Sequence, residues 1–326
     1  MSGRLAVFDI LKGIGILLVV VGHTFMREIG PFILSFHMPL FFIVSGYFFR
    51  PVAVQPQIRK DFRRLVVPYL FVTMAVMLLA AVQKYHAMHE VDFFWDTLYH
   101  NGTPAWFLLA LFGAKTLFNI IYRCFPQHYM TMAFGLSSVP CLLARWYDIP
   151  TYLSLGSAVC GVFFVAVGCY SREHDLLAKA ERCKPVVVVI ALVSWLVTST
   201  IGVVDLHYCT FKLWAIDFLG ACGGTYLCYV LSQQVERYSA KLGSWLSWCG
   251  YYSFVIYSFH TIEYVFPHWH QIASFAGTAC RAYVILALRL LFAWMAVLVT
   301  MRLPFLKVLF FPQAAATKRV EKSRVA

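Results

Sequence analysis

The chain has 326 residues, of which 61% are hydrophobic and only 13% are charged. Soluble globular proteins carry about 25% charged residues, so this composition excludes a soluble domain with a single anchor and indicates a polytopic membrane protein. The formal net charge is +12. This charge does not indicate nucleic-acid binding, because lysine and arginine collect on the cytoplasmic side of membrane proteins.

Apolar stretches long enough to cross a bilayer, which takes about 20 residues, recur along the whole chain. We therefore predict an all-α fold, a polytopic helical bundle of about ten transmembrane helices. The predicted spans cover residues 7–26, 31–49, 65–83, 105–123, 129–147, 152–171, 184–203, 212–232, 249–266 and 282–303. Residues 1–311 are expected to form the integral membrane domain and residues 312–326 a basic cytoplasmic tail.

Lysine and arginine are distributed unevenly between the connecting loops. With a cytoplasmic N-terminus, the inner segments hold most of them, and the outer segments hold only Arg27, Lys84, Arg145, Lys212 and Arg281. The positive-inside rule then predicts that the N-terminus is cytoplasmic, and an even number of spans returns the C-terminus to the same side. We expect a multi-pass protein of the cell's inner (plasma) membrane.

The first span, FDILKGIGILLVVVGHTF, contains the ionisable residues Asp9, Lys12 and His23. Such groups are costly inside a membrane and indicate function more than packing. Lys12 and His23 are eleven residues apart. At about 100° and 1.5 Å per residue, they fall within roughly 20° of one helical face and roughly 16 Å apart along it, with Asp9 near the same stripe. The alternative is a histidine that a neighbouring helix merely satisfies.

The second span places His37 near its outer end, at a depth similar to that of His23. Pro39 is expected to bend this helix, because proline cannot donate the backbone hydrogen bond. Ser45 and Gly46 are small, and we interpret them as a surface that lets another helix approach closely.

The next inner loop carries the densest basic cluster, formed by Arg59, Lys60, Arg63 and Arg64. Three- and four-residue spacings place several of these cations on one side of an entering helix. Two interpretations stay open with equal weight. The cluster is a topology signal that also contacts anionic lipid, or it binds phosphate.

The outer loop over residues 84–104 interleaves histidines and carboxylates with aromatic residues. This mixture is typical of sugar binding, but equally of an interfacial belt. Its histidines lack metal-ligand spacing, and we predict no metal site. Cys209 and Cys280 can both face outward, so a disulfide between them is considered.

The last two spans contain further ionisable residues. The ninth span carries Tyr257, His260 and Glu263 in its outer half, and His260 lies at roughly the depth of His23. Arg289 lies within the apolar tenth span and needs a partner inside the bundle, for which Asp217 is one candidate.

These motifs together resemble the membrane acyltransferase-3 family, and within it the fucose 4-O-acetylase-like and polysaccharide O-acetyltransferases. The matching motifs are Lys12 followed by His23, FHMPLFFIVSGYFF over residues 36–49, the basic run ending at Pro68, PAWF over residues 104–107, and the late pattern of Gly250, Ser253, Tyr257 and His260. The family's ten-span layout agrees with the predicted spans.

The resemblance implies acyl transfer from a cytosolic acyl-CoA, usually acetyl-CoA, to a hydroxyl of a glycan. It implies a catalytic role for His23 as general base, since neutral imidazole can take a proton from a hydroxyl that attacks the thioester. The alternative, in which His23 carries the acyl group covalently, stays open. We assign donor binding to Asp9, Lys12, Arg59, Arg63 and Arg64, and acceptor-binding or supporting roles to His37, Ser45, Trp106, Tyr257 and His260. The expected partners are acyl-CoA as substrate, a glycan or lipid-linked saccharide, and the lipid bilayer, with no bound cofactor and no nucleic acid.

Two other classes of protein are considered. The chain could be a transporter or flippase for a lipid-linked sugar, with charged residues along its path, although no inverted repeat supports this. It could also be a structural membrane subunit, against which the stripe in the first span argues. Consumption of an acyl-CoA thioester by purified protein separates the enzyme from the flippase.

Overall fold

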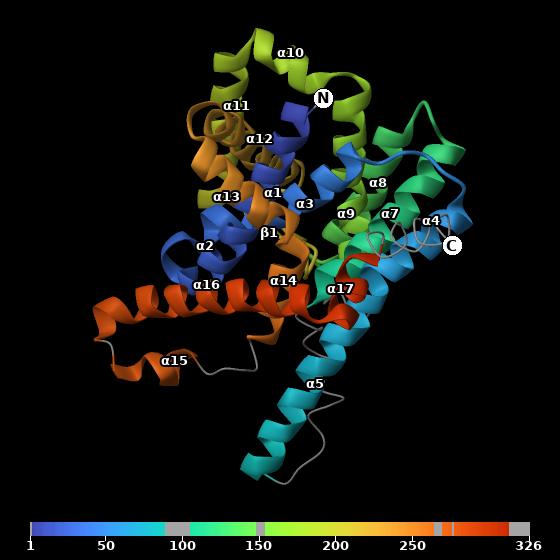
Figure 1. Ribbon diagram of the computed structural model, residues 1–326. Helices are drawn as coiled ribbons and strands as arrows, with labels where there is room; N and C mark the ends of the chain where they lie inside the picture. Colours follow the sequence, from blue (N-terminus) through green and yellow to red (C-terminus); the bar gives the residue numbers. More distant parts are fainter. Residues whose placement is uncertain (1, 89–104, 148–153, 264–268, 276, 313–326) are drawn as a thin grey trace, which may run out of the picture.

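The computed structural model describes residues 2–88, 105–147, 154–263, 269–275 and 277–312, which form a helical bundle with one short hairpin (Figure 1). The first half contains α1 (Ser2–Thr24), α2 (Met26–Leu34), α3 (His37–Tyr47), α4 (Val54–Asp61), the π-helix η1 (Phe62–Val66), α5 (Val67–Met88), α7 (Trp106–Cys124), α8 (Tyr129–Leu143) and α9 (Leu155–Glu173). The second half contains α10 (Leu176–Arg182), α11 (Lys184–Thr200), β1 (Val204–Asp205), β2 (Thr210–Phe211), α12 (Ala215–Tyr238), α13 (Ala240–Tyr251), α14 (Ser253–Ile262), α15 (Trp269–Ile272), the 3₁₀ helix η3 (Ala273–Phe275), α16 (Thr278–Arg302) and α17 (Pro304–Phe310).

The helical content and the apolar spans confirm a polytopic helical membrane protein. Among the described residues, seven stretches are long and apolar enough to cross a membrane, or eight if α10 and α11, bent by 110°, count as one span. The predicted spans at 129–147 and 249–266 coincide with the shorter apolar helices α8 and α14. Each of the ten predicted spans therefore falls on a helix, while the count of ten and the sidedness stay predictions.

The first helix lies at the centre of the bundle and packs most closely on α13. Gly13 of α1 faces the carbonyl of Leu246, and Gly250 of α13 faces the carbonyl of Asp9. A Cβ atom at either glycine would overlap the opposing backbone, so this approach requires glycine. In Figure 1, α16 runs across the other helices, and it contacts α1 as well as α14. The C-terminal turn of α1 is therefore covered by the C-terminal part of the chain, with Arg289 of α16 at Thr24 and His260 of α14 at His23.

The small residues of α3 make the second close helix contact. Gly46 packs on the carbonyl of Val165 in α9, and Gly168 of α9 packs on the carbonyl of Ile43. This geometry supports the packing interpretation of the Ser45–Gly46 step. Ser45 itself is half-buried beside this contact.

The second predicted span is interrupted just before Pro39. Helix α2 ends at Leu34 and α3 begins at His37. Pro39 therefore lies in the first turn of α3, where a missing N–H is tolerated. Pro39 has no N–H to donate to the carbonyl of Ser35, so the helical hydrogen bonding is interrupted between α2 and α3. The bend predicted at Pro39 is therefore present as a break before the proline.

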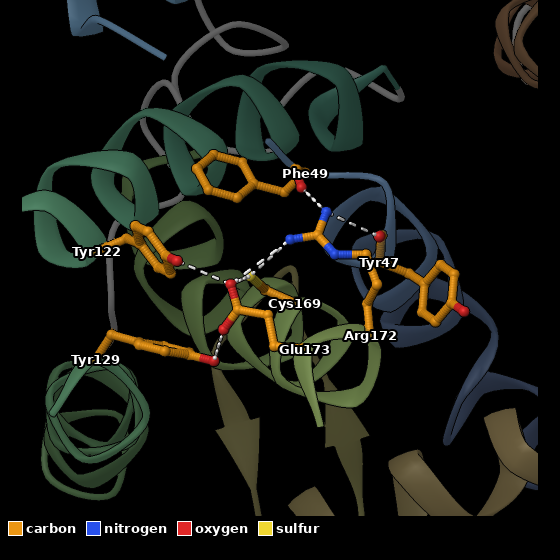
Figure 2. A network of polar contacts seen from close by, with 7 residues as sticks. All are labelled: Tyr47, Phe49, Tyr122, Tyr129, Cys169, Arg172 and Glu173. Atoms are coloured by element: carbon orange, nitrogen blue, oxygen red, sulfur yellow. Dashed lines mark hydrogen bonds and ion pairs between the residues drawn. The ribbon is translucent and has the colours of Figure 1, made fainter. Parts of the chain in front are cut away.

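A network around Glu173 joins the ends of four helices (Figure 2). The hydroxyls of Tyr122 and Tyr129 donate to the Glu173 carboxylate at 2.8 and 2.7 Å. Arg172 donates to the backbone carbonyls of Phe49 and Tyr47, just at and after the end of α3. The ends of α3, α7 and α9 and the start of α8 thus meet at one side of the bundle. The topology predicted from the sequence places all four of these helix ends on the cytoplasmic side, so their contact agrees with the predicted alternation of spans.

Two tertiary pairings considered from the sequence are wrong. Cys209 and Cys280 are both free thiols, one buried and the other exposed, so they form no disulfide. The buried cysteines Cys141 and Cys160 instead have their sulfurs 3.4 Å apart. The carboxylate of Asp217 accepts from the backbone N–H of Leu213 at 2.7 Å and does not pair with Arg289, whose partner is described below.

Candidate active site

His23 lies in the last turn of α1, and a local hydrogen bond holds its ring. Its Nδ1 lies 2.8 Å from the carbonyl oxygen of Val19, one turn earlier. A carbonyl can only accept, so Nδ1 carries the proton in this hydrogen bond. The neutral ring therefore has its lone pair on Nε2, the atom farther from the helix backbone. This tautomer has the form that a general base requires.

Two further imidazoles lie beside His23. The ring centroids of His23 and His260 are 5.2 Å apart, and those of His23 and His37 are 6.5 Å apart. His37 also donates its Nδ1–H to a carbonyl one turn earlier, that of Ile33, at 3.1 Å. We call these three side chains the imidazole cluster. The structure thus brings together three histidines that the sequence placed at a similar depth.

An acidic and a basic residue complete the surroundings of the cluster. The Glu263 carboxylate, with 1% of its side chain exposed, lies 3.4 Å from Nε of Arg289 and 3.7 Å from Nδ1 of His260. Trp269 donates its indole N–H to the same carboxylate oxygen at 3.0 Å. Arg289 also donates from Nη1 to the hydroxyl of Thr24 at 2.9 Å.

The sequence contained the signal for this ion pair, but its pairing was missed. Glu263 and Arg289 are oppositely charged residues in consecutive apolar segments. Charges in such positions pair inside the bundle, because a lone charge there is costly. The helix contact between α14 and α16 brings this pair together, whereas Asp217 is occupied by backbone N–H groups.

The basic cluster lines a pocket of about 430 Å³. Its walls are formed by Gln55, Pro56, Arg59, Lys60, Arg63, Arg64 and Pro312. The carboxylate within this segment, Asp61, points elsewhere and is buried against Lys115 of α7, with Nζ 2.8 Å from Oδ1. Since Lys115 occupies Asp61, the four cations of the pocket are not neutralised from within their own segment. The arrangement suits a polyanion.

The remaining donor candidates are separate from this pocket. Lys12 and Asp9 form an i,i+3 ion pair with Nζ 2.7 Å from Oδ1, and both side chains are partly exposed. Neither lines the basic pocket. The stripe predicted for α1 is thus present, with the ion pair in its first half and His23 in its last turn.

The other acceptor or supporting candidates lie on α3, α7 and α14. Trp106 begins α7, and its ring lies 5.1 Å from that of His207 in the turn between β1 and β2. Tyr257 is buried in α14 with its ring 5.5 Å from Phe107. Ser45 belongs to the contact of α3 with α9.

The geometry supports proton transfer and charge stabilisation at one place. A neutral imidazole of defined tautomer, two neighbouring imidazoles and an arginine anchored by a carboxylate can serve a reaction in which a hydroxyl loses a proton and an oxyanion forms. In the part of the chain that the structure describes, no group of three or more histidine, cysteine, aspartate or glutamate residues could hold a metal ion.

Comparison with known protein families identifies an acyltransferase domain. The family model described as an acyltransferase domain, the third acyltransferase family, matches residues 5–301. This range includes the imidazole cluster, the Arg289–Glu263 pair and all four cations of the basic pocket. No curated protein and no solved structure matches the chain.

Proposed function

The chain belongs to the acyltransferase-3 family, and we propose that it moves an acyl group, acetyl in the simplest case, from a cytosolic acyl-CoA to a hydroxyl of a glycan. Family membership makes the protein a membrane acyltransferase. The observation that supports the finer proposal is the hydrogen bond from Nδ1 of His23 to the carbonyl of Val19, which puts the proton on Nδ1 and the basic lone pair on Nε2.

In the proposed reaction, Nε2 of His23 takes the proton of the acceptor hydroxyl. The hydroxyl oxygen attacks the thioester carbonyl carbon, a C–O bond forms, and the carbonyl oxygen becomes an oxyanion. Collapse of this intermediate breaks the C–S bond, and the imidazolium returns the proton to the CoA thiolate. The products are an O-acyl glycan and CoA, and His23 ends in its starting state.

For the donor, we assign the CoA phosphates to the pocket of Arg59, Arg63 and Arg64. Guanidinium groups bind phosphate oxygens in a bidentate manner, and these side chains face a common pocket. Helix α5 begins next to this pocket and packs on α14, which carries His260. The pantetheine arm would follow this contact toward the imidazole cluster. Asp9 and Lys12 would supply a second cytosol-facing group on α1.

For the acceptor, we propose a glycan or lipid-linked saccharide of the cell envelope that approaches from the outer side of the inner membrane. His37 and His260 would orient its hydroxyl next to His23, because they are the side chains that surround that ring. Trp106 and Tyr257 would contact its sugar rings, and Ser45 would support the contact between α3 and α9. The resemblance to polysaccharide O-acetyltransferases supports this choice of acceptor.

The test compares His23→Ala, His37→Ala and His260→Ala in turnover of acetyl-CoA with a lipid-linked or polymeric glycan, normalised to folded protein. Loss of a general base lowers the rate by about 10²–10⁴-fold, so His23→Ala is expected to be nearly inactive while it still binds acetyl-CoA. A merely satisfied histidine would instead lower thermal stability and leave turnover per folded molecule almost unchanged. Normal turnover by His23→Ala would exclude its role as the base.

A further inference from the structure

Arg289 is the charged residue at the active site that the proposed reaction has not used. It belongs to α16, an apolar helix of 25 residues, and its side chain is 14% exposed. An arginine inside a membrane span is retained for function or is fully paired. The contacts of its guanidinium group separate these two cases.

Glu263 anchors Arg289 by a contact with Nε of its guanidinium group. The Glu263 carboxylate lies 3.4 Å from Nε of Arg289, which is longer than a normal N–H···O hydrogen bond. The same carboxylate oxygen also accepts from Trp269, so Glu263 itself is held in place. A planar guanidinium has five N–H donors, and a contact at Nε does not use the N–H donors of the Nη groups.

The Nη side of the guanidinium faces α1 at the turn that contains His23. Nη1 donates to the hydroxyl of Thr24, the residue after His23, at 2.9 Å. A fixed positive charge with N–H donors therefore lies beside the proposed base, and the Arg289 side chain is largely buried.

We propose that Arg289 is a catalytic residue that stabilises the oxyanion of the thioester carbonyl, and that Glu263 is its positioning residue. This inference rests on the proposed function. When the hydroxyl oxygen attacks and its proton moves to His23, the carbonyl oxygen gains the negative charge. The Nη groups of Arg289 then donate hydrogen bonds to this oxyanion. When the intermediate collapses, the electron pair on oxygen re-forms the C=O bond, the C–S electrons leave with the CoA sulfur, and that thiolate takes its proton from His23, so Arg289 gives up no proton.

The charge balance of the site agrees with this role. A guanidinium stays protonated throughout, so it supplies stabilisation without proton transfer. Preorganised donors count most where water is excluded, because they need no rearrangement as the charge develops. Glu263 offsets the cost of keeping the cation in the membrane, yet its contact at Nε does not cover the Nη groups.

The test uses the double variant Arg289→Met with Glu263→Gln, which removes both charges and leaves no buried charge without its partner. An interaction made only in the transition state changes kcat and not the donor KM. We expect kcat per folded protein to fall by about 10²–10³-fold, with an unchanged KM for acetyl-CoA. The matched control is Arg172→Met, which removes a partly buried guanidinium that contacts the backbone carbonyls of Tyr47 and Phe49 (Figure 2). It is expected to lower stability and keep kcat.

A second variant, Arg289→Ala, is assayed with added guanidinium chloride against the same concentration of sodium chloride. Recovery of kcat by guanidinium alone supports the role, since a structural arginine gives no such recovery in protein that is already folded. A kcat within a few-fold of the unaltered protein for the double variant would overturn the proposal. Parallel assays of His23→Ala separate the two claims: an inactive His23→Ala with an active double variant refutes only Arg289, whereas an active His23→Ala refutes the proposed base.

Discussion

Replacing Glu173 by Gln tests how the ends of four helices are held together. The carboxylate accepts hydroxyl hydrogen bonds from Tyr122 at 2.8 Å and from Tyr129 at 2.7 Å. A glutamine side chain has nearly the same shape but only one acceptor oxygen. One tyrosine therefore loses its acceptor, and the other keeps a neutral hydrogen bond in place of a charge-assisted one.

The magnitude follows from these two changes. A hydrogen bond to a charged group contributes about 1.5–3 kcal/mol, and a neutral one about 1 kcal/mol. The Glu173 side chain is 27% exposed, so water partly replaces the lost contact, which favours the lower end of these values. We expect Glu173→Gln to lower the free energy of unfolding by about 2 kcal/mol.

The assay is reversible unfolding of the purified protein in mixed micelles of increasing denaturing detergent, followed by circular dichroism. The matched control is the double variant Tyr122→Phe with Tyr129→Phe. In that background Glu173→Gln should cost much less, because the interaction it removes is already absent. A loss below about 0.5 kcal/mol in the unaltered background, which is the usual range for surface changes, would refute the network as a stabilising element.

Two predictions concern the donor and the topology. Replacing Arg63 and Arg64 together by Ala should raise the donor KM clearly and leave the acceptor KM nearly unchanged, since charge-assisted phosphate contacts contribute about 1.5–3 kcal/mol each. An unchanged donor KM in folded protein would mean that these arginines act only as a topology signal. Reporter fusions after Lys84 and after Lys318 should report the outside and the inside of the cell respectively, as the lysine and arginine distribution predicts; the same side for both would contradict the ten-span topology.

Local chemistry explains why so much of the site could be predicted. Whether a segment enters a bilayer depends on its own length and apolarity, so each predicted span falls on a helix. The stripe from Lys12 to His23 depends only on helical periodicity. Even the tautomer of His23 is set within one turn of α1, by the carbonyl of Val19. Interactions within about four residues are available from the sequence because the helix fixes their geometry.

The pairings between helices depended on the tertiary structure. Arg289 pairs with Glu263 and not with Asp217, because the choice depends on which faces of α14, α12 and α16 turn toward each other. Likewise, the basic pocket keeps its charge because Lys115, from a distant helix, occupies Asp61. Hydrophobicity brings these helices into the membrane but leaves their rotation and neighbours undetermined, since lipid tails are as apolar as the side chains they contact. Close contacts such as Gly13 on Leu246 and the buried ion pairs select one arrangement, and only that arrangement joins His23, His260 and Arg289 into one site.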